Sequence, residues 1–381
     1  MSFQCFLKDS LEKRKENNTY RKLISLPNLK DFTSNDYLGF ARSQELCTAI
    51  LQKCASTSSL GATGSRLLTG HSQYYEDLEC SIAQTHHAEN ALIFNSGYTA
   101  NLGLLSTIAS PEDRFIHDLY IHASMHDGIR LSKARSFPFR HNDIHHLQQR
   151  LETPYPGRTF VCVESVYSLH GSVAPLIEIQ ELCERYEAQL IVDEAHALGI
   201  FGDHGEGLVT MLGLQDKVLA TLYTFGKALG MHGAAIACST TLKHYLINFC
   251  RPFIYTTALP SSSLISIDLA YQHNYDAVEL RKHLSYLISF FRQQAEELGI
   301  SLPKGNALSP IQSICIPRAS RIRQVSQYLQ ESGFDVRPIL SPTVRQNQEL
   351  LRICIHTFNT EEEISQVLLL ISQALSCVSL L

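Results

Sequence analysis

Short apolar runs alternate with helical patterns along the chain from about residue 46 to residue 253. The clearest apolar runs cover residues 91–94, 160–165, 189–196 and 234–239. Uniformly apolar strands of this length, separated by helices, are typical of a mostly parallel sheet that is covered by helices on both faces. The pattern therefore predicts an α/β domain in this part of the chain.

The pattern changes after Pro260, where a helical periodicity continues over residues 264–299. The rest of the chain predicts strands at 311–316, 335–340 and 350–356 and helices at 323–333 and 361–375. These elements would form a compact α+β unit. We therefore predict three parts: an N-terminal helix and arm over residues 1–45, a large domain over 46–285 and a small domain over 286–381.

Composition narrows the class of protein without naming a function. The 381 residues are 44% hydrophobic and 18% charged, with a net charge of −5, as in ordinary globular proteins. No basic run exceeds residues 13–15, so we expect no nucleic-acid partner. The mean hydropathy is −0.05, and no apolar stretch approaches the roughly 18 residues of a membrane span. The first ten residues lack the apolar core of a signal peptide, so we expect a cytoplasmic protein.

Neither the 11 cysteines nor the 17 histidines form a metal-binding motif. The cysteines are scattered without a CxxC pair, and we expect reduced, mostly buried thiols. His141, His145 and His146 lie close together in RHNDIHHL, but the segment reads as a strand exit that leads into a polar helix. Close histidine spacing alone is weak evidence for a metal site. We therefore predict no metal.

Three reactive side chains follow apolar strands. Asp193 ends the run LIVD, His196 comes three residues later, and Lys227 lies in LYTFGKALG among small residues. Ligands of α/β proteins bind at the carboxyl edge of the sheet, where these side chains are expected. Asp193 is also suited to capping the next helix, and Lys227 to a solvated surface position.

A glycine-containing turn adds a candidate phosphate site. Ser96, Gly97 and Tyr98 follow the strand ALIF and begin a helix, so backbone N–H groups would point above the sheet. The glycine-rich segment 61–70 lacks the GK[ST] ending of a P-loop, which argues against a nucleoside triphosphatase. With His122 as a further candidate, the set of phosphate seat, carboxylate, histidines and lysine fits pyridoxal 5′-phosphate.

Nine segments in order carry a family resemblance: SNDYLGF (34–40), GSRLLTGHS (64–72), NSGYTAN (95–101), HND (141–143), ESVYSLHG (164–171), VDEAHALG (192–199), TFGKALG (224–230), IYTTALP (254–260) and SPIQ (309–312). On these segments the chain resembles the α-oxoamine synthases, pyridoxal-phosphate-dependent enzymes. Within that family the likeness is greatest to the synthases that form 8-amino-7-oxononanoate for biotin. The resemblance implies the fold type I of pyridoxal-phosphate-dependent transferases, with a large domain around a mostly parallel, seven-stranded-type sheet and a smaller C-terminal α+β domain.

The resemblance also implies roles for individual residues. Lys227 would form the Schiff base with the cofactor, Asp193 would pair with the ring nitrogen, and His122 would stack on the ring. The remaining cofactor contacts would come from Ser96, Gly97, Tyr98, Ser168, His196, Thr224, Thr256 and Thr257. One of the two threonines, Thr256 or Thr257, would reach the phosphate of a second subunit, because the family's site lies at a homodimer interface.

Substrate contacts are implied at Arg352 for the amino-acid carboxylate, at Asn35 and His122, and at Arg21 and Thr343 for the acyl substrate. A bidentate arginine suits a carboxylate, although Arg352 could also be an exposed strand residue. The chain departs from the family's P-T-V-P-x-G pattern, since it reads PTVRQNQELLR from residue 342. This loop borders the expected acyl pocket.

The implied reaction is a decarboxylative condensation of L-alanine with pimeloyl-CoA or a pimeloyl carrier protein, which gives 8-amino-7-oxononanoate, the free thiol and carbon dioxide. Three alternatives stay open. The chain could be another member of the family, namely a glycine C-acetyltransferase, 5-aminolevulinate synthase, serine palmitoyltransferase or aminoketone signal synthase. It could be a non-catalytic partner subunit, against which the intact Lys227, Asp193 and His122 argue. It could also be a phosphate-binding regulatory module.

Overall fold

The computed structural model describes residues 2–17, 19–23, 28–57, 59–303, 305 and 307–377. The chain divides into two compact units. The central unit comprises Asn35–Ser168 and Val173–His283, and the terminal unit comprises Met1–Ser34, Leu169–Ser172 and Leu284–Leu381. The division into three parts after residues 45 and 285 stays a prediction.

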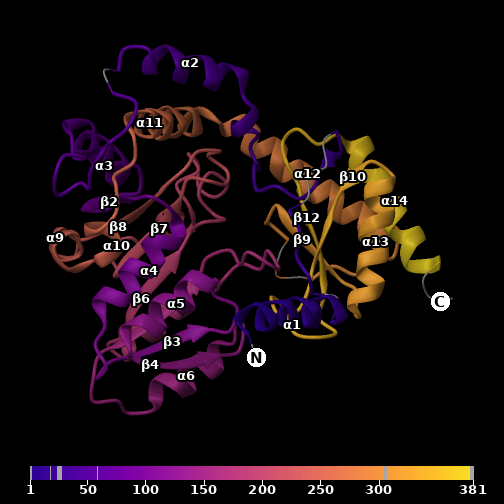
Figure 1. Ribbon diagram of the computed structural model, residues 1–381, viewed down its shortest axis with the longest axis horizontal. Helices are drawn as coiled ribbons and strands as arrows, with labels where there is room; N and C mark the ends of the chain where they lie inside the picture. Colours follow the sequence, from indigo (N-terminus) through magenta and orange to yellow (C-terminus); the bar gives the residue numbers. More distant parts are fainter. Residues whose placement is uncertain are drawn as a thin grey trace. The chain divides into compact units, whose positions relative to one another are not determined.

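A seven-stranded sheet forms the middle of the central unit (Figure 1). Its strands lie in the order β2 (Asn90–Phe94), β8 (Ala234–Cys238), β7 (Ala220–Thr224), β6 (Gln189–Asp193), β5 (Thr159–Glu164), β3 (Arg114–Asp118) and β4 (Arg135–Phe139). The five strands from β7 to β4 pair in parallel. The predicted α/β fold with a mostly parallel sheet is confirmed.

One strand runs against the others. β8 pairs antiparallel with both β7 and β2. Its connection from β7 consists of residues 225–233, which is shorter than the dozen or more residues that a parallel crossover needs. The apolar run 234–239 is therefore a strand as predicted, but a reversed one. The short connection carries Lys227.

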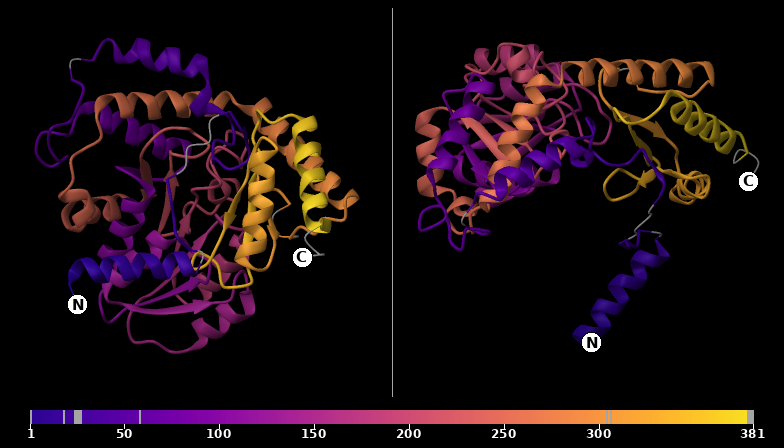
Figure 2. Two further views of the ribbon diagram at one scale, coloured as in Figure 1. Left: turned by 45° about the vertical axis from the view of Figure 1, so that its right-hand side comes forward. Right: turned by 90° about the horizontal axis from the view of Figure 1, so that it is seen from above.

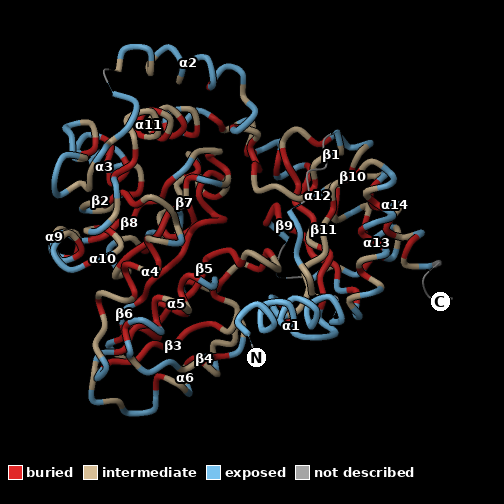
Figure 3. The backbone as a smooth tube through the Cα atoms, viewed as in Figure 1, coloured by how far each residue is buried: buried red, intermediate tan, exposed pale blue. Residues whose placement is uncertain are grey.

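Helices cover both faces of this sheet, and most strand residues are buried between them (Figure 3). One face packs against α4 (Gly97–Ile108), α5 (Ala123–Ser132), α9 (Thr240–Phe249) and α10 (Arg251–Ile254). The other packs against α6 (Ile144–Glu152), α7 (Leu176–Arg185) and α8 (Leu208–Met211). Strands such as β5 and β6 thus bury side chains on both faces, which explains why their sequences are apolar without alternation.

Further helices of the central unit are η1 (Phe40–Arg42), α2 (Gln44–Cys54), α3 (Gln73–Thr85) and α11 (Ser261–Asp276). Of these, α3 packs against β2. α11 packs against α2 and α3 (Figure 1). The predicted helical run 264–299 is two helices, because α11 ends at its C-cap Ala277 before α12 (Val278–Glu297) begins.

The terminal unit is built from both ends of the chain. Strand β1 (Lys30–Asp31) pairs in parallel with β10 (Phe334–Asp335). A second, antiparallel sheet has the order β11 (Arg337–Ile339), β12 (Leu350–Cys354), β9 (Ile311–Cys315). Helix α13 (Ala319–Glu331) packs against this sheet and against α14 (Glu361–Cys377), as Figure 2 shows. The predicted polar helix at the N-terminus is α1 (Phe3–Glu16).

Two composition-based expectations can be compared with the described residues. No helix among them is both long and apolar enough to cross a bilayer. Ten of the cysteines there are free thiols, and five of these ten are buried: Cys162, Cys183, Cys238, Cys250 and Cys354. Four others are exposed, so burial of these thiols is less general than predicted.

Candidate active site

The residues predicted to hold the cofactor all lie in the central unit. Asp193 is the last residue of β6, and Thr224 is the last residue of β7. Ser96 and His122 are the N-caps of α4 and α5, which follow β2 and β3. In a parallel sheet the carboxyl ends of the strands share one edge, so these side chains are brought to the same edge.

Asp193 is fixed at both carboxylate oxygens. It is 4% exposed, and its Oδ2 accepts a hydrogen bond of 2.7 Å from Asn101 Nδ2. Its Oδ1 accepts one of 2.9 Å from the backbone N–H of Ala195. The bond from Ala195 is the local turn contact that suits an aspartate at the end of a strand. The bond from Asn101 comes from the interior of α4, and no local turn requires it.

Lys227 ends a chain of four hydrogen-bonded side chains. Its Nζ lies 2.8 Å from His196 Nε2. On the other side of the imidazole, His196 Nδ1 lies 2.8 Å from the hydroxyl of Tyr37. That hydroxyl donates to Asn35 Oδ1 at 3.0 Å. Tyr37 and His196 are buried, so the chain leads from the protein interior to the lysine amine.

His122 caps α5 and leaves its ring exposed. Its Nδ1 accepts from the backbone N–H of Ser124 at 3.3 Å and lies 2.7 Å from the Ser124 hydroxyl. Partial removal of the ring from water lowers the pKa of His122; the Asp193 carboxylate opposes this shift and the Lys227 ammonium adds to it. The ring is therefore neutral at neutral pH. A neutral, exposed ring can lie against a flat aromatic group.

The start of α4 forms a cradle with Thr224. Ser96 and Thr99 exchange the reciprocal bonds of a capping box, with Ser96 Oγ accepting from Thr99 N at 3.2 Å. A Cβ on Gly97 would lie 2.8 Å from Thr224 Cγ2, so any larger residue there would force Thr224 to shift. Thr224 Oγ1 is buried, and no residue in the described ranges hydrogen-bonds to it. Tyr98 is half-exposed, and its hydroxyl donates to Asp127.

Thr256 and Thr257 lie beside this cradle within the same chain. Asn95 Nδ2 donates to Thr256 Oγ1 at 3.1 Å and to the backbone oxygen of Thr257 at 2.8 Å. Asn95 directly precedes Ser96, so the two threonines are anchored to the turn that starts α4. Their expected contact with a second subunit stays a prediction.

Glu164 is a second buried carboxyl at this edge. It ends β5 and pairs in register with Asp193 on β6. Its Oε2 accepts from the backbone N–H of Ser168 at 3.1 Å. Burial raises the pKa of Glu164 well above its usual range, and the neighbouring Asp193 charge adds to the shift. Burial thus favours the neutral form of Glu164, and its Oε2 holds the segment that carries Ser168.

The predicted substrate residues are divided between the units. Asn35 belongs to the central unit, through its bond to Tyr37. Arg21, Thr343 and Arg352 belong to the terminal unit. Within that unit Arg21 Nη2 lies 3.5 Å from Thr343 Oγ1, so two segments far apart in sequence meet there. Arg352 lies on β12, and its Nη1 donates to the Cys354 thiol at 3.0 Å.

Sequence reasoning missed Tyr37, Asn101 and Glu164. Glu164 could have been found, because it ends an apolar strand in the same way as Asp193. Tyr37 and Asn101 carry no such signal. Their partners lie 159 and 92 positions away in the sequence, and only the folded chain brings them together.

The histidine-rich segment has ordinary partners. His141 Nδ1 contacts the buried Asp118 at 3.0 Å, His145 contacts Gln149, and His146 accepts from the backbone of Arg140. Throughout the part of the chain that the structure describes, no group of three or more His, Cys, Asp or Glu side chains could hold a metal ion.

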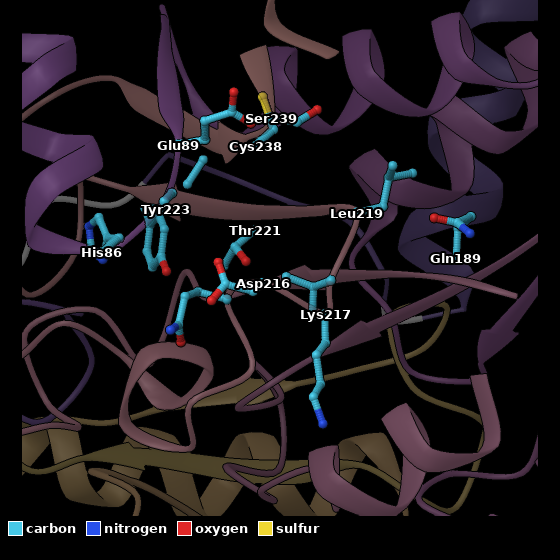
Figure 4. A pocket seen from close by; sticks show the side chains of 14 residues that line it. His86, Glu89, Gln189, Asp216, Lys217, Leu219, Thr221, Tyr223, Cys238 and Ser239 are labelled. Atoms are coloured by element: carbon cyan, nitrogen blue, oxygen red, sulfur yellow. The ribbon is translucent and has the colours of Figure 1, made fainter. Parts of the chain in front are cut away.

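A cavity of about 290 Å³ lies at the opposite edge of the same sheet, where β6 and β7 begin (Figure 4). Asp216 and Lys217 line its rim, and His86 and Tyr223 line its inner part. His86 Nδ1 donates to the Glu206 backbone oxygen at 2.9 Å, and its Nε2 lies 3.0 Å from the Tyr271 hydroxyl. None of the predicted cofactor residues lines this cavity.

Comparison with known proteins decides the family. The model of the class I and II aminotransferases matches residues 27–369. The chain belongs to the class I and II aminotransferase family. In this family the chain is 39% identical to the 8-amino-7-oxononanoate synthase of Emericella nidulans, over 95% of this chain and 93% of that protein.

Solved structures give the same fold. The crystal structure of 8-amino-7-oxononanoate synthase from Francisella tularensis matches with a TM-score of 0.81 and 30% identity, over 92% of this chain and 99% of that one. A serine palmitoyltransferase from S. paucimobilis, with a bound PLP–myriocin aldimine, matches with a TM-score of 0.90 and 26% identity over 98% of both chains. The aminotransferase fold predicted from the sequence is confirmed.

Proposed function

We propose that this protein uses pyridoxal 5′-phosphate to condense L-alanine with a pimeloyl thioester to 8-amino-7-oxononanoate. The observation that carries the proposal is the 2.8 Å contact of Lys227 Nζ with His196 Nε2, at the sheet edge where the buried Asp193 ends the neighbouring strand. Lysine, histidine and carboxylate are the groups that this chemistry needs. Relatives named 8-amino-7-oxononanoate synthase, at 39% and 30% identity, support the choice of substrates.

The groups at this edge fit each part of the cofactor. The buried, unpartnered Thr224 Oγ1 and the space above Gly97 suit a phosphate, which would also accept from the N–H groups at the start of α4. Lys227 Nζ is the attachment point for the aldehyde carbon. The remaining contacts are assigned to Ser96 and Tyr98 at the phosphate, Asp193 at the ring nitrogen, His122 at the ring face, and Ser168 and His196 at the ring hydroxyl.

When bound, pyridoxal phosphate supplies an electron sink for the α-carbon of the amino acid. Lys227 Nζ takes the α-proton, and His196 Nε2 then accepts a hydrogen bond from the protonated amine. Asp193 is held by two donors and keeps its carboxylate aimed at one point. His122 is neutral, so it adds no second positive charge next to Lys227.

A bond forms between the α-carbon of alanine and the thioester carbonyl carbon, and the C–S bond breaks with release of the thiol. The bond to the carboxyl carbon then breaks with release of carbon dioxide, and the α-carbon regains a proton. Arg352 binds the carboxylate of alanine before this loss, as a guanidinium does well.

The acyl donor is pimeloyl-CoA or a pimeloyl carrier protein, and we assign Arg21, Thr343 and Asn35 to substrate binding. The 3.5 Å contact of Arg21 with Thr343 supports a shared role for these two residues. We further propose a cytoplasmic homodimer in which Thr256 or Thr257 contacts the phosphate in the second subunit.

A second candidate is the condensation of serine with palmitoyl-CoA. The TM-score of 0.90 to a serine palmitoyltransferase favours it, since it exceeds the 0.81 to the Francisella structure. Sequence identity favours the first candidate instead. One fold hosts several specificities, so the substrates have to be tested directly.

The test is thiol release by the purified, cofactor-loaded protein. Three pairs are compared: pimeloyl-CoA with L-alanine, palmitoyl-CoA with L-serine, and acetyl-CoA with glycine. We expect release with the first pair, together with the amino ketone of the expected mass. If thiol is released only with another pair, the proposed substrates are wrong, but the proposed role of Lys227 stands. A protein that releases no thiol from any pair would contradict the proposal.

A further inference from the structure

Two helices that begin at the candidate active site are joined by a buried amide. Asn101, in the interior of α4, donates from Nδ2 to Asp193 Oδ2 at 2.7 Å and to Ser124 Oγ at 3.1 Å. Ser124 Oγ in turn lies 2.7 Å from Nδ1 of His122, the N-cap of α5. Asn101 is 2% exposed and Ser124 is 0% exposed, so bulk water cannot replace these contacts. One side chain thus connects the buried carboxylate with the histidine.

Close packing of the two helices permits this connection. Gly128 lies one turn after Ser124 on α5, and a Cβ on it would lie 2.9 Å from the backbone oxygen of Asn101. The same Cβ would lie 2.9 Å from Leu105 Cβ. Glycine therefore lets α5 approach α4 closely enough for the short side chains of Asn101 and Ser124 to meet.

We propose that Asn101 is a positioning residue: it holds the carboxylate of Asp193 and, through the hydroxyl of Ser124, keeps the proton of the neutral His122 ring on Nε2. Asn101 is assigned no contact with the cofactor or the substrate. It acts on the site through Asp193 and His122, which the proposed function places at the ring nitrogen and the ring face of the cofactor.

The orientation of the amide follows from the charge of Asp193. A carboxylate can only accept hydrogen bonds, so the NH₂ group of Asn101 has to face it. The reverse orientation would place Asn101 Oδ1 against Asp193 Oδ2 with no proton between the two oxygens. With Nδ2 at Asp193, Asn101 Oδ1 is buried, and no residue in the described ranges hydrogen-bonds to it. An unpaired buried carbonyl is costly, so this orphaned oxygen indicates that the position needs both N–H groups.

The two bonds use both N–H protons of the amide, so Ser124 Oγ is an acceptor toward Asn101. The backbone N–H of Ser124 donates to His122 Nδ1 at 3.3 Å, and a backbone N–H group can only donate. Nδ1 is therefore unprotonated, and in the 2.7 Å contact the Ser124 hydroxyl is the donor. The proton of the neutral ring is then on Nε2, whatever that nitrogen contacts.

A proton on Nδ1 would break this arrangement. The Nδ1–H group would face the backbone N–H of Ser124, and the hydroxyl proton of Ser124 would lose its acceptor. Asn101 opposes this change, because its N–H group occupies Ser124 Oγ and polarises the O–H group toward Nδ1. The amide thus strengthens the bond that keeps Nδ1 unprotonated and gives the hydroxyl one orientation.

The experiment is nitrogen-15 NMR of the histidine side chains, with the full-length protein measured at neutral pH as purified and again loaded with pyridoxal phosphate. His122 is assigned with a His122→Gln variant. In the native protein we expect a proton on Nε2 and a hydrogen-bonded, unprotonated Nδ1. Ser124→Ala removes the hydroxyl and should move the Nδ1 resonance toward that of a free ring nitrogen. Asn101→Leu, which is nearly isosteric, should move it in the same direction but less far, because the hydroxyl remains.

The double variant tests whether Asn101 acts through Ser124. Adding Asn101→Leu to Ser124→Ala should leave the Nδ1 resonance where Ser124→Ala alone puts it, since the connection is already cut. Asn274→Leu is the matched control, because it removes another buried amide, whose Nδ2 donates to the backbone oxygen of His204 at 2.9 Å. It should leave the His122 resonances unchanged.

Turnover should separate the two contacts of Asn101. Asn101→Leu also removes a hydrogen bond from Asp193, so kcat should fall about five- to tenfold with KM for the amino acid unchanged. Ser124→Ala leaves that bond in place and should lower kcat less. This effect on kcat rests on the proposed function, whereas the state of His122 does not.

A proton on Nδ1 in the native protein would overturn the proposal. An Nδ1 resonance that stays unchanged in Asn101→Leu or in Ser124→Ala would also overturn it. Asn101→Ala, which removes the same two donors, takes the place of Asn101→Leu if the leucine variant does not fold. Failure of thiol release alone would overturn only the proposed function.

Discussion

Two buried histidines of the central unit each contact a buried tyrosine. At the candidate active site His196 contacts Tyr37, and in the inner part of the second cavity His86 contacts Tyr271. His86 also donates to a backbone oxygen and stacks on Tyr223 at 3.6 Å between ring centroids. All partners of His86 in these contacts are neutral.

The difference lies in the remaining nitrogen of each ring. For His196 it faces a lysine amine that is partly exposed to solvent, whereas for His86 it faces a second fixed neutral group. Burial lowers the pKa of His86 to about 3, so that ring stays uncharged. A buried tyrosine–histidine pair is therefore a stabilising element by itself. Such a pair becomes part of a site when the other imidazole nitrogen contacts a charged group that is partly exposed to solvent.

The strongest test of this comparison replaces one lysine at the candidate active site and one at the second cavity by alanine. Lys227→Ala should lower thiol release by about 10²- to 10⁴-fold, because it removes the group that moves the proton. It should also abolish covalent fixation of the cofactor by borohydride. Lys217→Ala, at the rim of the cavity on the opposite edge, should change neither quantity. A borohydride adduct on another lysine of Lys227→Ala would refute the assignment.

Replacing the carboxylate of Asp193 should lower turnover less than replacing Lys227. Asp193→Asn keeps the shape of the side chain and removes its charge, so the cofactor should bind while kcat falls. One charged hydrogen bond corresponds to a loss of about 10- to 100-fold. Asp216→Asn at the opposite edge is the control. Equal kcat values for the two variants would show that the charge of Asp193 has no part in the reaction.

Substitutions of the two histidines should have different consequences: that of His86 for stability and that of His196 for activity. His86→Gln should lower the free energy of unfolding at neutral pH by about 1–3 kcal/mol, through imperfect replacement of two buried hydrogen bonds. His196→Gln should instead lower thiol release, with a smaller effect on unfolding. Urea unfolding and thiol release of both variants check this. A variant of His196 with normal turnover would remove the distinction between the two histidines.

The pH dependence of His86 has a definite sign. In the unfolded chain the ring takes up a proton as the pH falls below about 6.5, but in the fold it resists protonation down to about 3. The stability that neutral His86 contributes is therefore complete above pH 6.5 and is lost as the pH falls from 6.5 to 3. The difference in unfolding free energy between native protein and His86→Gln should shrink over this range. A constant difference would contradict the low pKa.

The smallest effect is expected at the phosphate cradle. Gly97→Ala would place a Cβ 2.8 Å from Thr224 Cγ2, so Thr224 has to move. We expect about tenfold weaker cofactor binding, measured by titration of the cofactor-free protein, for a loss of about 1.4 kcal/mol. Gly61→Ala is the control, because nothing lies within 4 Å of its Cβ position. Equal affinities would show that the cradle tolerates a side chain.

Much of the fold could be predicted from the sequence because five strands of the large sheet, β2, β5, β6, β7 and β8, are short apolar runs, whereas β3 and β4 carry charged or polar residues and were not among the predicted runs. The reversal of β8 was not predicted, although the short connection over residues 225–233 requires it. The split of one helical pattern at Ala277 was not visible either, because the residues on both sides keep the same periodicity. Periodicity reports which residues are buried, and it says little about where one helix stops.

The candidate site shows a similar division. Asp193, Thr224 and Lys227 follow strands, and the position of a residue after a strand can be seen in the sequence. The bond of Asn101 to Asp193 and that of Tyr37 to His196 connect distant segments. Such contacts depend on how α4 and the segment before η1 are packed, which local patterns do not encode.

The pairing of β1 with β10 has a consequence for how the chain is made. Thr33 Oγ1 donates to the backbone oxygen of Asp335, a partner 302 positions later. During synthesis on the ribosome, at roughly 5–20 residues per second, the N-terminal strand waits roughly 15–60 s for this partner to emerge. The central unit can fold in that interval, since all of its strands are made before α12. Strand β1, which is made before the whole central unit, is thus among the last elements to find its partner.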